Sequence, residues 1–128
     1  MIRKETAEHY NWGANCDGWH LVKQPGVSVI HERMPPRTSE TRHYHQTAWQ
    51  FFFVLSGTAT LEIGGQRETL HALEGVEVQP GVAHQMFNLS DEPTEFLVIS
   101  MPPSHGDRVQ AEDSNPASAL LDGPARRE

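Results

Sequence analysis

Residues 43–57 read HYHQTAWQFFFVLSG and carry the strongest structural signal in the chain. Aromatic and branched residues from Trp49 to Leu55 favour a β-strand, and the glycine at the end of the stretch marks a turn. Because side chains alternate across a strand, Gln50, Phe52 and Val54 share one face. The opposite face carries Phe51, Phe53 and Leu55. Since both faces are apolar, we expect one to line a barrel interior and the other to be covered by a sheet segment or another subunit.

Further short strand-like runs lie on both sides of this strand, and turn residues such as Pro25-Gly26 and Pro80-Gly81 separate them. The Gly64-Gly65 pair lies between two runs and predicts a tight hairpin, where positive φ is needed. Many short strands with regular turns, and no convincing helix before residue 110, predict an all-β sandwich or barrel. The expected strands are Trp19–Val22, Val27–Met34, Arg42–His45, Trp49–Leu55, Thr58–Ile63, Glu68–Leu70, Val76–Gln79, His84–Asn88 and Glu95–Met101.

Two distant segments carry histidines with matching parity. The histidines of the H-x-H sequence at 43–45 point to the same side of their strand, and His84 begins the later strand. If these side chains and Gln50 all face the interior, three imidazoles and one amide lie where polar groups without partners are costly. One divalent ion satisfies their lone pairs at once. The pattern predicts a single metal site with the ligands His43, His45, Gln50 and His84.

These two half-motifs resemble the motifs of the cupin superfamily. The first is written G-x5-H-x-H-x(3,4)-E-x6-G, and the second G-x5-P-x-G-x2-H-x3-N. The matching residues of this chain are His43, His45, Gln50 and Gly57 for the first motif, and Gly81, His84 and Asn88 for the second. The resemblance covers roughly residues 27–101. It implies an all-β fold, the double-stranded β-helix (jelly-roll) cupin barrel, with Asn88 holding a turn.

Besides Gly75, which is not at the usual spacing for the first glycine of the second motif, the chain departs from these motifs at three positions. Arg37 stands where the first glycine is usual, and Gln79 where the proline of the second motif is usual. The third departure is Gln50, where cupins usually carry Glu. A neutral amide leaves a divalent site doubly positive, which makes a stronger Lewis acid and favours an anionic substrate. Some small cupins that act on sugar acids resemble this arrangement with Gln as a ligand, although Gln50 could also act as a hydrogen-bonding neighbour of the ion.

The resemblance implies a small metal-binding protein, and the sequence leaves three functions open. The first is a metalloenzyme that acts on a small oxygen-bearing substrate, anionic or sugar-derived, by isomerase or lyase chemistry. The second is an iron-dependent dioxygenase, which needs only three neutral ligands. The third is a non-enzymatic barrel that binds a small ligand. The expected cofactor is one divalent transition metal, with Fe, Mn, Ni and Zn as candidates.

Two further residues are candidates for catalysis. Glu32 lies inside as an acid or base if it shares a face with Ile30, although we slightly favour the opposite parity, which leaves it in solvent. Arg108 follows the last expected strand and could close the barrel mouth and bind an anionic substrate, with a solvated turn as the alternative. Four other histidines have no partners at ligand spacing and are expected on the surface. These are His9, His20, His31 and His71.

Composition bounds the rest of the interpretation. The 128 residues suit one domain. We expect a barrel over residues 1–104, with an irregular lead-in up to residue 18. A mobile tail is expected over residues 105–128. The formal net charge of -7 and the lack of Lys/Arg clusters argue against nucleic acid. The absence of a signal sequence and of a long apolar run predicts a cytoplasmic protein without a membrane partner. The apolar Phe51–Leu55 face predicts a homodimer.

Overall fold

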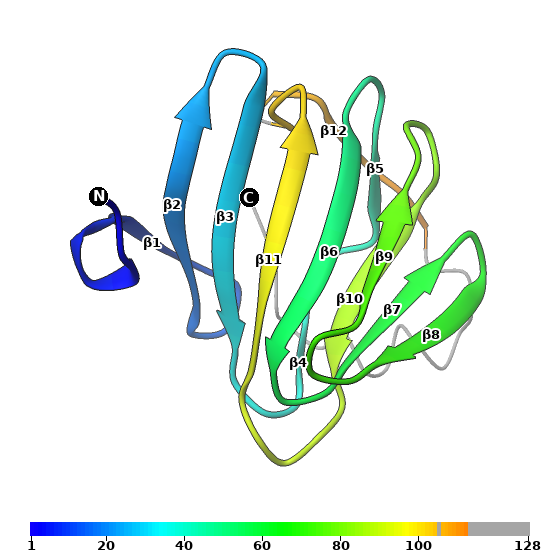
Figure 1. Cartoon of the computed structure of the whole chain (residues 1–128). Helices are drawn as coiled ribbons and strands as arrows, with labels where there is room; N and C mark the ends of the chain where they lie inside the picture. The colour runs from blue at the N-terminus through cyan, green and yellow to red at the C-terminus, as the bar shows by residue number, and fades with distance from the viewer. Residues whose placement is uncertain (105, 113–128) are drawn as a thin grey trace.

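Two antiparallel sheets face each other across the core of the chain (Figure 1). The computed structural model describes residues 1–104 and 106–112. One sheet has the strand order β1-β2-β3-β11-β6-β9, and the other has the order β12-β5-β10-β7-β8, with β4 paired to β10. The strands of the described residues are β1 (Glu8–Trp12), β2 (Cys16–Gln24), β3 (Val27–Met34), β4 (Thr38–Ser39), β5 (His43–His45), β6 (Trp49–Ser56), β7 (Ala59–Ile63), β8 (Gln66–Leu70), β9 (Gly75–Val78), β10 (His84–Asn88), β11 (Thr94–Met101) and β12 (Arg108–Gln110).

This arrangement confirms the all-β jelly-roll barrel expected from the sequence. Gly64 and Gly65 turn the β7–β8 hairpin with φ of 57° and 96°, in the region that two-residue hairpin loops require. Arg37 has a φ of 62°, which explains why a glycine is usual at this position. Its guanidinium pairs with Asp91 at 2.7 Å, on the surface.

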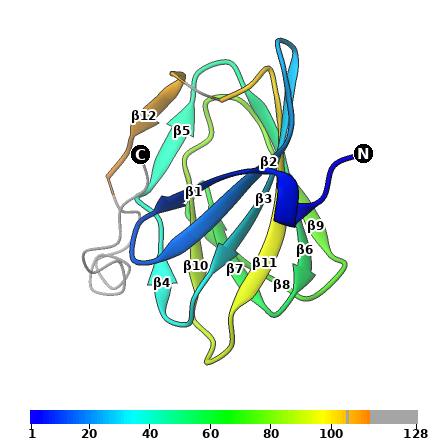
Figure 2. The same cartoon turned by 90° about the vertical axis from the view of Figure 1, so that its left-hand side faces the viewer.

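The first 18 residues differ from the expected irregular lead-in. After a short 3-10 helix, η1 (Lys4–Thr6), β1 pairs with the first half of β2 around a turn that contains Gly13 and Asn15, both with positive φ. Figure 2 shows this hairpin crossing the side of the barrel from one sheet towards the other. Trp12 and Cys16 anchor it because both side chains are buried in the core. Turn residues flank β1, so its sequence does not indicate a strand, and the strand is stabilised by its pairing with β2.

The C-terminal boundary also differs from the expected start of the tail at residue 105. Residues Arg108–Gln110 form β12, which pairs with β5 and extends the second sheet. Beyond the strand, the Ala111 N–H donates to the Arg42 carbonyl at 2.9 Å. The barrel therefore includes residues 106–112, while the expectation of a mobile tail over 113–128 lies outside the described residues.

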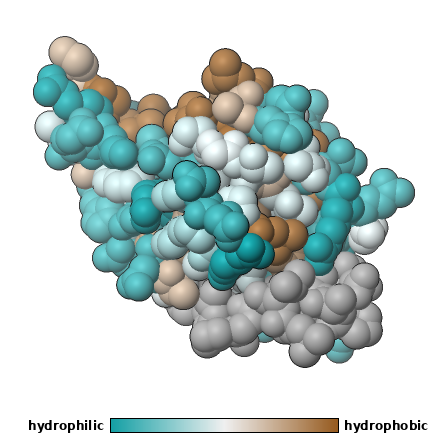
Figure 3. All heavy atoms as spheres, turned by 90° about the horizontal axis from the view of Figure 1, so that it is seen from below, coloured by the Kyte–Doolittle hydropathy of each residue, from teal (hydrophilic) through white to brown (hydrophobic). Residues whose placement is uncertain are grey.

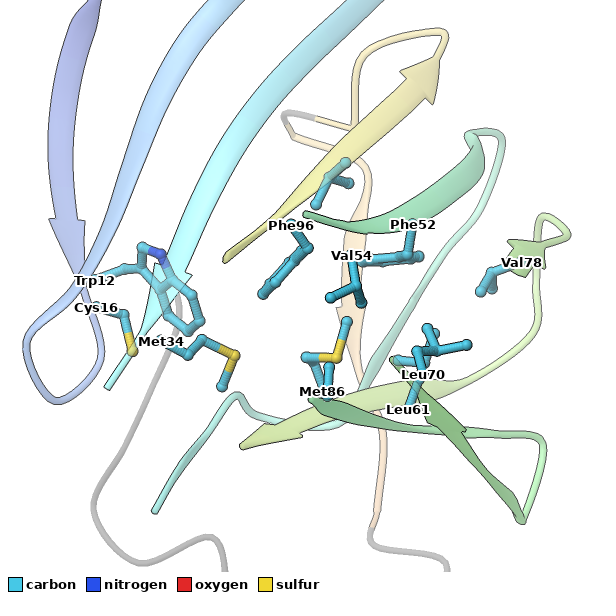
Figure 4. Close-up of a cluster of buried hydrophobic side chains, with 12 residues drawn as sticks. Trp12, Cys16, Met34, Phe52, Val54, Leu61, Leu70, Val78, Met86 and Phe96 are labelled. Atoms are coloured by element: carbon cyan, nitrogen blue, oxygen red, sulfur yellow. The ribbon is translucent and has the colours of Figure 1, made fainter. Parts of the chain in front are cut away.

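The core lies between the two sheets and is continuous along the barrel (Figure 4). Alternate residues of β6 and β11 point into it, so the inward side chains are fully buried and their neighbours are half-buried. Asn88 confirms its expected structural part, because its amide donates to the carbonyls of Met34, Pro35 and Glu92 and its oxygen accepts from Ser90. The largest fully buried apolar side chains are Phe52, Phe87, Phe96, Met34, Leu61 and Met86.

The outer face of β6 carries a row of aromatic rings. The rings of Trp49, Phe51 and Phe53 follow one another at centroid distances of 6.4 and 6.1 Å. Gly75 on the neighbouring strand β9 leaves room for the phenylalanine rings, since an added Cβ would lie 2.7 Å from the Phe51 ring. The row is half-buried within one chain, so the predicted homodimer remains a prediction.

The lower end of the barrel is mainly hydrophilic (Figure 3). Its hydrophobic residues form small, separated groups between polar ones, as is normal for a solvated surface. Among the residues that the structure describes, no helix has the length and apolar character needed to span a bilayer.

Candidate metal centre and adjoining cavity

Three histidines meet on the inner face of the second sheet. His84 on β10 is the cross-strand partner of His43 on β5, and His45 lies two residues further along β5 on the same face. The ring centroids of His43 and His84 are 4.5 Å apart, and one ring nitrogen from each of the three residues lies within 4.8 Å of the others. All three side chains are buried. The structure therefore brings together the three histidines that the sequence predicted as ligands.

Backbone carbonyls orient two of these rings. The Nδ1 atoms of His43 and His84 lie 2.8 and 3.0 Å from the carbonyl oxygens of Thr41 and Val82. A carbonyl oxygen only accepts, so each Nδ1 carries the proton and each Nε2 carries the lone pair. Metal-binding histidines have the same arrangement, in which the second ring nitrogen donates to a backbone or carboxylate oxygen.

Gln50 faces the barrel interior from the opposite sheet, on β6, and is buried. Its Nε2 donates to the Ser100 hydroxyl at 3.0 Å. Among the described residues, no group donates to its Oε1. A buried amide oxygen without a donor costs free energy, and a cation is one group that satisfies it. The predicted inward orientation of the Gln50 side chain is thus observed, and its role as a fourth metal ligand stays a prediction.

Backbone contacts tie the two motifs together around the histidines. The Gly81 N–H donates to the His45 carbonyl at 2.7 Å, so the turn before β10 is fixed to the end of β5. Glu40 is fully buried, and its carboxylate lies 4.0 Å from His43 Nδ1 and accepts from the Met86 N–H at 3.0 Å. Glu40 could not be singled out from the sequence, because it lies in a polar loop segment without strand alternation.

Asp107 holds the short loop between His45 and Gln50. Its carboxylate accepts from the backbone N–H groups of Gln46, Thr47 and Ala48 at 2.9–3.0 Å and from the Thr47 hydroxyl at 3.1 Å. Partial burial raises the pKa of Asp107, but these hydrogen bonds outweigh it and lower the pKa below its ordinary value. The loop that separates two candidate ligands is therefore fastened by a residue beyond the expected barrel boundary.

A cavity of about 740 Å³ adjoins the histidine cluster and shares His45 with it. Several of its lining residues come from the two sides of the β2–β3 turn and from the segment that follows β11, and Figure 1 shows both of these backbone segments at the top. The lining combines hydroxyl groups with the cationic side chain of Arg108 and with an ion pair between Lys23 and Glu8 at 3.3 Å, which suits a polar ligand. The lining residues are Glu8, Tyr10, His20, Lys23, Ser28, Ile30, His45, Pro103, Ser104, Gly106 and Arg108.

The remaining candidates occupy different places. Arg108 lines the cavity, is the cross-strand partner of His45, and donates to the Thr41 carbonyl at 3.2 Å. Glu32 is fully buried, so the favoured solvent-exposed parity was wrong. His20 is half-buried and lines the cavity, so it is only partly exposed at the surface where it was expected. Tyr10 was not singled out in the sequence, because the hairpin that carries it was not predicted.

Comparisons with known proteins agree with this architecture. A family model described as the Cupin domain matches residues 30–100 of this chain. None of the curated proteins matches the chain.

Solved structures with the same fold include proteins of several activities. KdgF from Halomonas sp. superposes with a TM-score of 0.75 at 12% identity, covering 82% of this chain and 94% of that chain. A sugar phosphate isomerase of the cupin superfamily from Silicibacter pomeroyi gives 0.72 at 19% identity, covering 80% and 76%. The nucleoside dehydratase Pac13 gives 0.73 at 14% identity, covering 88% and 90%, and a Streptomyces Pac13 variant was solved with uridine. At these identities the likeness shows the fold alone.

Proposed function

Because this chain belongs to the Cupin domain family, we propose that it is a metal-dependent enzyme that acts on a small anionic, sugar-derived substrate by isomerase or lyase chemistry. The observation that carries the proposal is the position of His45, which belongs both to the three-histidine cluster and to the wall of the cavity. A substrate in the cavity therefore lies beside the candidate metal centre.

The donor set fits a divalent transition metal. His43, His45 and His84 would hold the ion with Gln50 as the fourth ligand, since imidazole suits Fe, Ni and Zn and the amide oxygen is open to a cation. Such an ion supplies Lewis-acid polarisation of a substrate oxygen. The four neutral ligands leave its charge uncompensated, while the Glu40 carboxylate lies behind His43 rather than among the predicted ligands.

The cavity wall supports an anionic substrate. Arg108 places positive charge at the lining, and a guanidinium can bind a carboxylate or phosphate through two parallel hydrogen bonds. The second cation of the lining, Lys23, pairs with Glu8 at 3.3 Å. The hydroxyl groups of Ser28 and Ser104 offer hydrogen bonds suited to a polyol. A sugar phosphate isomerase and a nucleoside dehydratase with this fold support the view that the barrel accommodates such chemistry.

Metal analysis of matched variants tests the centre. We expect the purified chain to retain one equivalent of metal and His84→Ala to lose it, while His71→Ala retains it because His71 is exposed and pairs with the nearby Glu74, away from the cluster. Retention by His84→Ala equal to that of the unmodified chain would contradict the proposed ligand set.

A turnover assay tests the reaction class. Proton NMR in D2O should show deuterium entering carbon positions next to a carbonyl in D-ribose 5-phosphate or D-galacturonate. Dioxygen uptake by the iron-loaded protein without such exchange would instead favour the dioxygenase. Metal retention and sugar binding without either reaction would favour the non-enzymatic barrel.

A further inference from the structure

A second polar cluster lies on the N-terminal hairpin and lines the same cavity as His45. Tyr10 on β1 and His20 on β2 both line the cavity, and their ring centroids are 5.1 Å apart. Both residues precede the segment 30–100 that the family model matches. Neither belongs to the two motifs, so this cluster is a feature of this chain's own hairpin.

The pairing register explains how Tyr10 reaches a buried carboxylate. Tyr10 on β1 is paired with Gly18 on β2, and Gly18 is paired with Glu32 on β3, so the three residues form one row across three strands. An added Cβ on Gly18 would lie 2.2 Å from the Tyr10 ring, so only glycine leaves room for it. The tyrosine therefore lies across β2, and its hydroxyl donates to Glu32 Oε2 at 3.0 Å.

A carboxylate at this position is costly if it serves packing alone. Glu32 is fully buried, whereas the next inward residue on the same strand, Met34, is apolar. Well-packed apolar residues usually stabilise a core as well as, or better than, a buried charged group. The row places a proton acceptor beside the hydroxyl of a tyrosine that lines the cavity, which is the arrangement of an activated acid–base residue.

We propose that Tyr10 is the general base of the reaction and that Glu32 positions it and accepts its proton, an inference that rests on the proposed function. A substrate carbon next to a carbonyl gives its proton to the Tyr10 oxygen, and the Tyr10 proton moves to Glu32 Oε2. The electron pair of the broken C–H bond forms the C=C bond of an enolate, and the carbonyl π electrons move to the carbonyl oxygen. Return of both protons in a later step restores the resting state, so no further reactant is consumed.

Two conservative variants and one control test this relay. Tyr10→Phe keeps the ring over Gly18, and Glu32→Gln keeps an oxygen that can accept the tyrosine hydrogen bond but is not basic. We expect each to slow deuterium exchange in D-ribose 5-phosphate or D-galacturonate about 100-fold, the lower end for general acid–base catalysis. KM, metal content and melting temperature should stay near those of the unmodified protein. Tyr44→Phe is the control, because Tyr44 lies on the opposite face of its strand from His43 and His45.

A second readout needs no turnover. The chain has two tyrosines, so tyrosine labelled with carbon-13 at Cζ gives two signals, and Tyr10→Phe assigns them. We expect Glu32→Gln to shift the Tyr10 signal and leave Tyr44 unchanged, and D-galacturonate to shift Tyr10 in the unmodified protein. A Tyr10 signal that responds to neither change would overturn the proposal.

The outcomes separate the two proposals. Full exchange rates in Tyr10→Phe or Glu32→Gln would refute the relay and leave the metal-dependent function standing. If the unmodified protein exchanges neither sugar, the proposed function fails for these substrate classes, and the carbon-13 signals alone decide whether Tyr10 and Glu32 are coupled and face a ligand.

Discussion

Replacing Asp107 with alanine should destabilise the barrel measurably, although the residue lies beyond the last strand expected from the sequence. The substitution removes the acceptor for three backbone N–H groups and one hydroxyl in the 46–48 loop. Because the site is accessible to water, each hydrogen bond contributes about 0.5 kcal/mol, the low end of the usual range, which gives about 2 kcal/mol in total. For a domain of this size, that loss lowers the melting temperature by roughly 8 °C.

The pH dependence makes the test specific. Hydrogen bonds lower the pKa of Asp107, so its contribution is present above the unfolded pKa of about 4 and is lost as the pH falls through the lower folded pKa. We therefore expect the gap in melting temperature between the unmodified protein and Asp107→Ala to be constant near neutral pH. The gap should close once the pH has fallen below the folded pKa, when the carboxylate is protonated in both states.

Circular dichroism melts across this pH range measure the gap directly. Asp91→Ala is the matched control, since it removes an equally charged residue from an exposed pair with Arg37, and such pairs contribute about 0–1 kcal/mol. The reasoning would be refuted by equal melting temperatures of Asp107→Ala and the unmodified protein at neutral pH. A gap that persists unchanged in acid would show that the carboxylate charge is not the cause.

Other expectations follow from the same structure. Gln50→Glu should keep the fold and tighten metal binding, because a carboxylate is the better donor and lowers the charge of the site; weaker metal retention in a folded variant would contradict this. Truncation after Glu112 should leave the melting temperature unchanged. Truncation after Ser104 should lower it by more than Asp107→Ala does, since β12 is also lost; an unchanged melt would show that β12 adds no stability. Light scattering at micromolar concentration should give the mass of a dimer. Phe53→Lys on the outer face of β6 should give a monomer that still binds metal. A stable monomer of the unmodified chain would disprove the dimer.

The amino-acid sequence by itself determined the features that depend on neighbouring residues. Alternation along Trp49–Ser56 assigned the inward face of β6, and spacing along the chain assigned His43, His45 and His84 to inward positions. Both inferences use the two-residue period of a strand, which holds whatever the strand pairs with. The Gly64-Gly65 hairpin was predictable for the same reason, because its backbone requirement is local.

Only the tertiary structure decided which of the weaker segments become strands and what faces the cavity. β1 and β12 have little strand character of their own, and long-range pairing with β2 and β5 stabilises them. The inward position of Glu32 was equally undecided, because the run Val27–Met34 has polar residues on both parities and the face that is buried depends on the opposite sheet. The cavity combines side chains from β1, β2, β5 and β12, so no local pattern in the sequence could have assembled it.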